Sequence, residues 1–152
     1  PGLMQVFGNV NLQAGSTVAL ELGGLVVDTG YDRLDVADAE STGTVEGNAD
    51  IAAGSIFDID FFGGFVAGLG DTFDVLVADD ITVVDLGAVV FDFSGALLGT
   101  GLAWNTAIVA FDGVREALRL TVVSDEVAVP EPGAILILLA GLVGLLIIRR
   151  QT

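Results

Sequence analysis

Apolar and polar residues alternate along most of the first 128 residues, and this alternation limits the possible fold more than any other feature. In the segment 57–61, three apolar side chains point one way and the carboxylates of Asp58 and Asp60 point the other. Similar alternation recurs at 17–22, 34–36, 73–77 and 118–122. Period-two runs bounded by Gly, Asn and Asp are typical of β-strands. We therefore expect the region before residue 129 to be almost wholly β.

A repeat with a spacing of 39 residues is also present. Segment 6–16 reappears as segment 45–55, and each copy then runs through further alternation into a Gly-Gly pair. The alignment matches the following apolar residues: Leu12 with Ile51, Leu20 with Ile59, and Leu22 with Phe61. Self-similarity at this length is the signature of stacked structural units.

The repeat favours a right-handed β-solenoid-like ectodomain over residues 1–123, in which apolar side chains stack inward from coil to coil. We expect two repeats, at roughly 6–44 and 45–84, followed by a terminal cap at 85–123. The cap differs in sequence from the repeats, as an end unit that covers a strand edge must. The alternative architecture is a β-sandwich or jelly roll built from the same strands.

Trp104, the single tryptophan of the chain, falls in the predicted cap. We expect its indole to pack inside the cap. A tryptophan of this kind can also stack on a carbohydrate ring, which is the functional alternative.

The C-terminus carries a second strong signal. Val129-Pro130-Glu131-Pro132 precedes an uncharged apolar run at 133–148, and Arg149-Arg150 follows. As a helix the run spans roughly 24 Å at 1.5 Å per residue, slightly less than a hydrocarbon core of about 30 Å. Terminal arginines that snorkel and local bilayer thinning make up such a difference.

These features predict a linker at 124–132, one transmembrane helix at 133–148 and a cytoplasmic basic tail at 149–152. Basic flanks stay on the cytoplasmic side, so residues 1–131 are expected outside the cytoplasm. The alternative is an apolar helix docked on its own domain, although a helix that is apolar on every face belongs in lipid or in a large core.

Composition fits an exported protein. The chain has no Cys, His or Lys, and twenty acidic residues stand against three arginines before Pro130. Binding to nucleic acid or to an anionic membrane surface needs clustered Lys or Arg, so neither partner is expected. Neither disulfides nor thiol-bound metals are possible without cysteine. Because no signal peptide precedes the acidic region, we expect a mature form or the C-terminal piece of a longer protein.

Enzymatic activity is not expected, because acid–base and nucleophilic catalysis favour His, Cys or Lys. Asp58 and Asp60 lie about 7 Å apart on one strand face, a spacing that a glycosidase can use. A solvated strand face in an acidic chain predicts the same pair. Asp58, Asp60, Asp79 and Asp80 are weak candidates for calcium, which takes hard oxygen ligands. No other cofactor is expected.

The tail resembles the PEP-CTERM sorting signal of Gram-negative bacteria. This resemblance rests on Val129, Pro130, Glu131 and Pro132, the apolar run 133–148, and the arginine pair that follows. Upstream, the segments 30–36, 54–55, 70–76 and 102–106 look like the β-rich ectodomains often attached to that signal. The resemblance implies recognition by a membrane exosortase, cleavage near Pro-Glu-Pro, and delivery to the cell surface or matrix, commonly alongside exopolysaccharide production.

Two functions follow as hypotheses. The first is a non-enzymatic surface or matrix protein, anchored in the inner membrane and then processed by exosortase, with a structural or adhesive role in an exopolysaccharide biofilm. The second is a carbohydrate-binding or carbohydrate-active protein whose decisive residues lie in a missing N-terminal part.

Overall fold

The computed structural model describes residues 1–37 and 47–125, and this part of the chain is mainly β. The predicted linker residues 126–132, the predicted helix 133–148 and the tail 149–152 lie outside the described residues. The elements are β1 (Leu3–Phe7), β2 (Val10–Leu12), β3 (Thr17–Leu22), β4 (Arg33–Ala37), β5 (Asn48–Ile51), β6 (Ile56–Phe61), β7 (Thr72–Ala78), β8 (Asp80–Val83), the 3₁₀ turn η1 (Leu86–Ala88), β9 (Val90–Gly95), β10 (Leu102–Ala110) and β11 (Glu116–Ser124).

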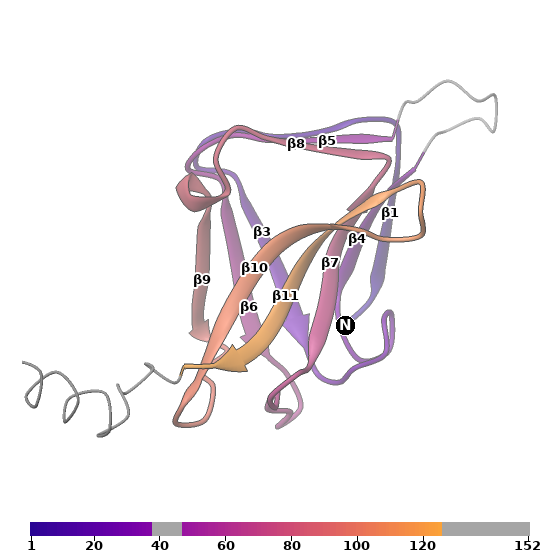
Figure 1. Cartoon of the computed structure of the whole chain (residues 1–152). Helices are drawn as coiled ribbons and strands as arrows, with labels where there is room; N and C mark the ends of the chain where they lie inside the picture. Colours follow the sequence, from indigo (N-terminus) through magenta and orange to yellow (C-terminus); the bar gives the residue numbers. More distant parts are fainter. Residues whose placement is uncertain (38–46, 126–152) are drawn as a thin grey trace, which may run out of the picture.

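The first nine strands enter three sheets in a fixed order (Figure 1). Sheet A takes β1, β4 and β7, sheet B takes β2, β5 and β8, and sheet C takes β3, β6 and β9. Every pairing among these nine strands is parallel. The chain therefore makes three successive coils of three strands each. Each coil contributes one strand to each of the three sheets.

The strand register coincides with the sequence repeat. Leu12 lies opposite Ile51 in sheet B, and Leu20 and Leu22 lie opposite Ile59 and Phe61 in sheet C. These are the residue pairs that the 39-residue repeat aligns. A parallel ladder in which equivalent residues are neighbours keeps each apolar side chain on the core face, because a shift by one residue would turn it outward.

The third coil differs from the sequence prediction. It consists of β7, β8 and β9, and β9 pairs with β6 through residues 90–95. The cap predicted from residue 85 therefore begins inside this third coil, and the antiparallel hairpin of β10 and β11 starts only at Leu102. At the other end, β11 continues through Ser124, one residue beyond the predicted domain end.

The core runs along the inside of the coils. Leu22, Phe57, Ile59, Phe73 and Leu120 are fully buried. Aromatic rings form its central part: Phe57 stacks on Phe91 with centroids 5.4 Å apart. Burial of each such side chain contributes about 1.5–3 kcal/mol to folding.

The hairpin β10–β11 extends sheet A and crosses the end of the third coil (Figure 1). β11 pairs with β7, and the carboxylate of Glu116 accepts a hydrogen bond from the backbone N–H of Ile81 in β8 at 2.9 Å. Trp104 in β10 stacks on Phe93 in β9. The hairpin thus contacts one strand of every sheet and covers this end of the coil.

Candidate functional site

The predicted sorting residues are not placed by the structure. Val129, Pro130, Glu131 and Pro132 lie outside the described residues, as do Arg149 and Arg150. Within residues 1–37 and 47–125, no helix is long and apolar enough to cross a membrane. The prediction of an exosortase site therefore continues to rest on the sequence.

The four calcium candidates fall in two separate places. Asp58 and Asp60 lie on β6 in sheet C, whereas Asp79 and Asp80 lie where β7 passes into β8. Asp58 is the register neighbour of Asp92. Among the described residues, no group of three or more acidic, His or Cys side chains could hold a metal ion.

Local surroundings account for two of these carboxylates. Asp80 accepts a hydrogen bond from the hydroxyl of Thr82 at 2.9 Å. The side chain of Asp60 lies directly over Gly95, where an added Cβ would come within 1.4 Å of Oδ1. The arrangement is that of polar groups on a strand face, and it does not assign acid and base roles to Asp58 and Asp60.

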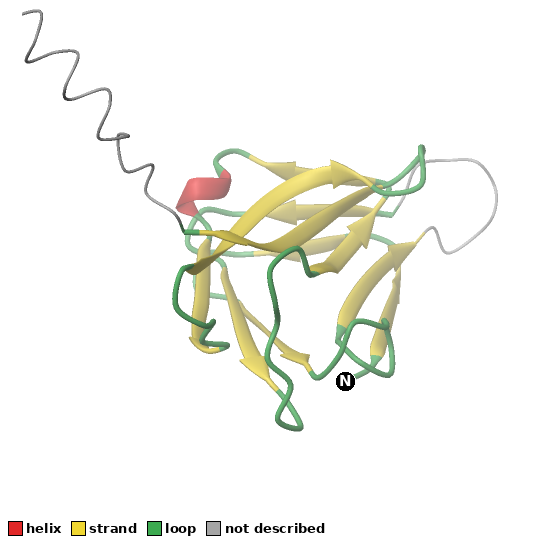
Figure 2. Cartoon of the chain, turned by 60° about the horizontal axis from the view of Figure 1, so that its bottom comes forward, coloured by secondary structure: helices red, strands yellow, loops and turns green. Residues whose placement is uncertain are grey.

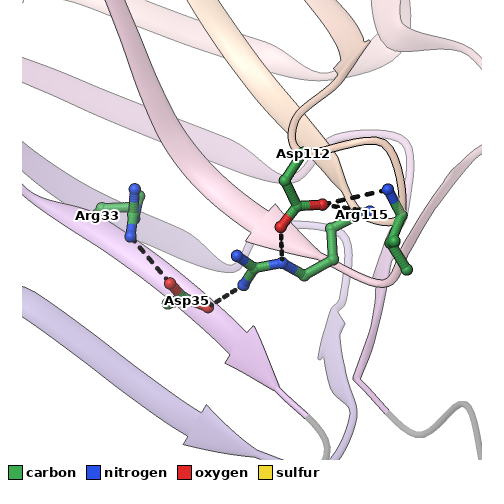
Figure 3. A network of polar contacts seen from close by, with 5 residues as sticks. Arg33, Asp35, Asp112 and Arg115 are labelled. Atoms are coloured by element: carbon green, nitrogen blue, oxygen red, sulfur yellow. Dashed lines mark hydrogen bonds and ion pairs between the residues drawn. The ribbon is translucent and has the colours of Figure 1, made fainter.

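A network of ion pairs that was not predicted from the sequence lies on the outer face of sheet A (Figure 3). We call it the polar constellation. Asp35 on β4 bridges two arginines: Nη2 of Arg33 donates to it at 3.0 Å and Nη1 of Arg115 at 3.2 Å. Arg115 also donates from Nε to Asp112 at 2.9 Å. Both guanidinium groups lie over the ring of Phe111, at 5.4 and 5.1 Å from its centroid.

This constellation ties the tip of the β10–β11 hairpin to the second coil. Asp35 is 7% exposed and comes from β4, whereas Phe111, Asp112 and Arg115 come from the hairpin turn. Buried charges are stable only when they are paired and hydrogen-bonded, and here the carboxylate has two cationic partners. The Nε of Arg33 is buried without a hydrogen-bond partner.

The turn itself is held by Asp112. Its carboxylate accepts the backbone N–H of Arg115 at 2.9 Å and that of Val114 at 3.2 Å. The backbone N–H of Arg115, followed by its side chain, lowers the pKa of Asp112 to about 2. Hydrogen bonds to the charged form are a general cause of such a depression.

Arg119 on β11 is paired in the same way. It makes a bidentate contact with Asp74 on β7, through Nε at 2.6 Å and Nη2 at 3.0 Å. The hydrogen bonds to Asp74 raise the pKa of the guanidinium, while burial raises the pKa of the neighbouring Tyr31 phenol. All three arginines before Pro130 therefore pair with aspartates.

The small number of cationic residues is the one sequence signal that could have predicted these ion pairs. Only Arg33, Arg115 and Arg119 can neutralise the acidic region before Pro130, and a carboxylate partner for each follows from their small number. The sequence does not indicate which aspartate pairs with which arginine. Asp35 and Arg115 are 80 residues apart in sequence, and the stacking of the coils brings them together.

Trp104 packs inside the cap, as expected from the sequence. Its ring lies against Phe61, Phe73 and Phe93, and its indole N–H donates to the carbonyl oxygen of Ala96 at 3.0 Å. The ring face stacked on Phe93 and the indole N–H are therefore engaged inside the cap.

A shallow hollow of about 430 Å³ lies at the first coil, beside β1 and β3. Its walls are mainly apolar, with Met4, Val18 and Leu34 among the lining residues. Met4 is 66% exposed although its neighbour Leu34 is buried, because no described strand is stacked on the free side of β1. The hollow is the uncovered end of the coil, and the charged residues that line it are Asp32 and Arg33.

No protein-family model matches this chain, and no curated protein is similar to it.

Proposed function

We propose that this protein is an exported, membrane-anchored surface or extracellular-matrix protein that an exosortase processes near Pro130-Glu131-Pro132. The observation that carries the proposal is the order of three elements at the C-terminus: the Pro-Glu-Pro motif, the apolar run 133–148, and Arg149-Arg150. In this proposal the basic end stays in the cytoplasm of a Gram-negative cell and the β-rich region faces outward from the inner membrane.

We further infer that the three coils form a right-handed β-solenoid. Successive strands enter three sheets in turn, the nine coil strands pair in parallel, and equivalent residues of neighbouring coils are register partners. Units stacked in this way are stabilised mainly by their nearest neighbours and build elongated, stiff shapes. Such a domain suits a structural or adhesive role in a matrix that contains exopolysaccharide.

The proposed role is non-enzymatic. The chain has no His, Cys or Lys, and the arginines at 33, 115 and 119 are engaged by Asp35, Asp112 and Asp74. An enzyme acting on an acidic polysaccharide would need cationic groups free to neutralise its substrate. The excess of carboxylates instead suits a solvated surface that repels other copies.

Cell fractionation tests the proposal. Wild-type protein and a Pro130→Ala/Glu131→Ala/Pro132→Ala variant are expressed in a host with exosortase and in the same host without it. We expect wild-type protein at the cell surface or in the medium only when exosortase is present, and the triple variant in the inner membrane in both hosts. A Val127→Ala variant, changed just outside the motif, should behave like wild type. Identical inner-membrane retention of all forms would refute sorting.

A further inference from the structure

One corner of the coil is apolar in a chain that is otherwise strongly acidic. β3, β6 and β9 end together in sheet C, since Leu22 pairs with Phe61 and Asp60 with Gly95. The connections that follow them, 23–32, 62–71 and 96–101, therefore all leave from the same end of sheet C, at the bottom of the molecule in Figure 1, which Figure 2 brings forward. Segments 22–27, 61–70 and 93–111 carry no charged residue.

Six large apolar side chains on these connections are at least half exposed, and we call them the apolar ridge. They are Leu25 (54%), Val26 (65%), Phe62 (50%), Val66 (60%), Leu69 (66%) and Leu97 (73%). Twelve large hydrophobic residues are exposed in the part of the chain that the structure describes, and half of them lie on these three connections. Clustered exposed apolar groups mark interaction sites, whereas single ones need no explanation.

The acidic residues of the same connections are turned to backbone groups. Asp32 accepts the backbone N–H of Glu21 at 2.8 Å, Asp71 accepts that of Gly68 at 2.7 Å, and Asp28 accepts that of Leu3 at 3.2 Å. These carboxylates shape the turns. The large apolar side chains of the ridge project from the turns that these carboxylates hold.

The chain leaves the domain beside this ridge. The backbone N–H of Asp125, the last described residue, donates to the carbonyl oxygen of Gly101 at 2.8 Å. One connection away, Gly70 donates to the carbonyl oxygen of Val122 at 2.9 Å. Seven residues, 126–132, separate Asp125 from the apolar run, and even a fully extended chain of that length reaches only about 25 Å.

We propose that the apolar ridge rests on the bilayer that holds the C-terminal helix, so that the β-domain lies on the membrane surface with this corner down. The proposal rests on the proposed membrane anchoring and adds the orientation of the domain. Exposed Leu, Val and Phe gain by entering the headgroup boundary. The carboxylates of the same connections are few and accept backbone hydrogen bonds, so this side of an acidic protein is repelled least by an anionic membrane.

A single-cysteine label tests this directly, because the chain has no native cysteine. The full chain, tail included, is reconstituted into phosphatidylcholine vesicles that contain nitroxide lipids, with a fluorophore at Val66→Cys. The matched control carries the label at Val84→Cys, a residue that is 97% exposed and lies between sheets B and C, away from the ridge. We expect the nitroxide to quench the label at 66 about threefold more strongly than the label at 84.

A second variant links the quenching to the ridge itself. Val66→Asp/Leu69→Asp should return the quenching of a label at Leu97→Cys to the level seen at position 84, while Val84→Asp should leave it unchanged. Repeating the measurement with phosphatidylglycerol vesicles should preserve the contrast between the two labels.

The outcomes separate the two proposals. Vesicle flotation with equal quenching at 66 and 84 would overturn the ridge contact and leave the anchor standing. Failure of the full chain to float with vesicles would overturn both. Self-quenching at 66 that rises with the protein-to-lipid ratio, without quenching by nitroxide lipid, would show that a second copy covers the ridge and would also overturn the proposal.

Discussion

Trp104 stacks on Phe93 with ring centroids 5.1 Å apart and planes 11° from parallel. The two residues belong to different sheets, since Trp104 lies on β10 at the edge of sheet A and Phe93 lies on β9 at the edge of sheet C. The stack closes the end of the third coil. An end left open would expose apolar side chains and unpaired strand edges, which favour aggregation.

Replacing Trp104 should therefore weaken the whole domain. We expect Trp104→Ala to lower the free energy of unfolding by about 2–3 kcal/mol, somewhat less than for a fully buried tryptophan because the residue is only partly buried. Trp104→Phe should lose less. The measurement is urea unfolding of the full chain in detergent micelles, followed by circular dichroism. Val114→Ala, at a residue that is 83% exposed, is the control, and a Trp104→Ala variant as stable as that control would contradict the capping role.

The bridge from Asp35 to two arginines gives a second prediction. Asp35→Ala leaves Arg33 and Arg115 close together without their shared carboxylate, so we expect a loss of about 2–3 kcal/mol. Asp112→Ala should cost less, because Asp112 is exposed and water replaces its contacts. The same urea titration checks the order of the two variants. A larger loss for Asp112→Ala would mean that the turn, and not the bridge, holds the hairpin.

Gly95 provides a test of the register between β6 and β9. Gly95→Ala should destabilise the domain, because the new Cβ would meet the side chain of Asp60. Shortening that side chain as well, in Gly95→Ala/Asp60→Ala, should restore most of the lost stability. Gly99→Ala is the control, since the nearest atom to its Cβ would be 4.0 Å away. Thermal unfolding of wild type and these variants decides, and the register would be wrong if the double variant were no more stable than Gly95→Ala.

Acid should remove the contribution of Asp112. Its pKa in the folded protein is about 2, below its ordinary value of 3.8. Its ionised form therefore stabilises the fold above pH 3.8, and the contribution is lost as the pH falls through about 2. We expect the melting temperature of wild type to exceed that of Asp112→Asn at about pH 5 and the difference to shrink between about pH 4 and 2. A difference that stays constant over this range would contradict the assignment.

The β-rich fold and the coil-to-coil pairing can be predicted from sequence because both arise from local patterns. Alternation identifies strands such as β6, and the repeat spacing that aligns Leu20 with Ile59 predicts their register. The third coil was not predicted because its connections differ in length: Ile51 and Val83 are register partners only 32 residues apart, not 39. A repeat is hard to detect in the sequence when the connections differ in length from coil to coil and only the strand pattern is the same.

The polar constellation and the apolar ridge were not predictable for a related reason. Asp35 meets Arg115, and Leu25 shares a corner with Leu97, only because three coils and a hairpin bring distant segments together. No local pattern encodes such contacts.

The intact mass of the protein released from cells tests the central claim most directly. Processing by exosortase near Pro130-Glu131-Pro132 predicts a released species that lacks the apolar run 133–148 and the two arginines. The mass should shift to the uncleaved value, and the protein should remain in the membrane, when exosortase is absent. A released species that still carries residues 133–152 would contradict the account.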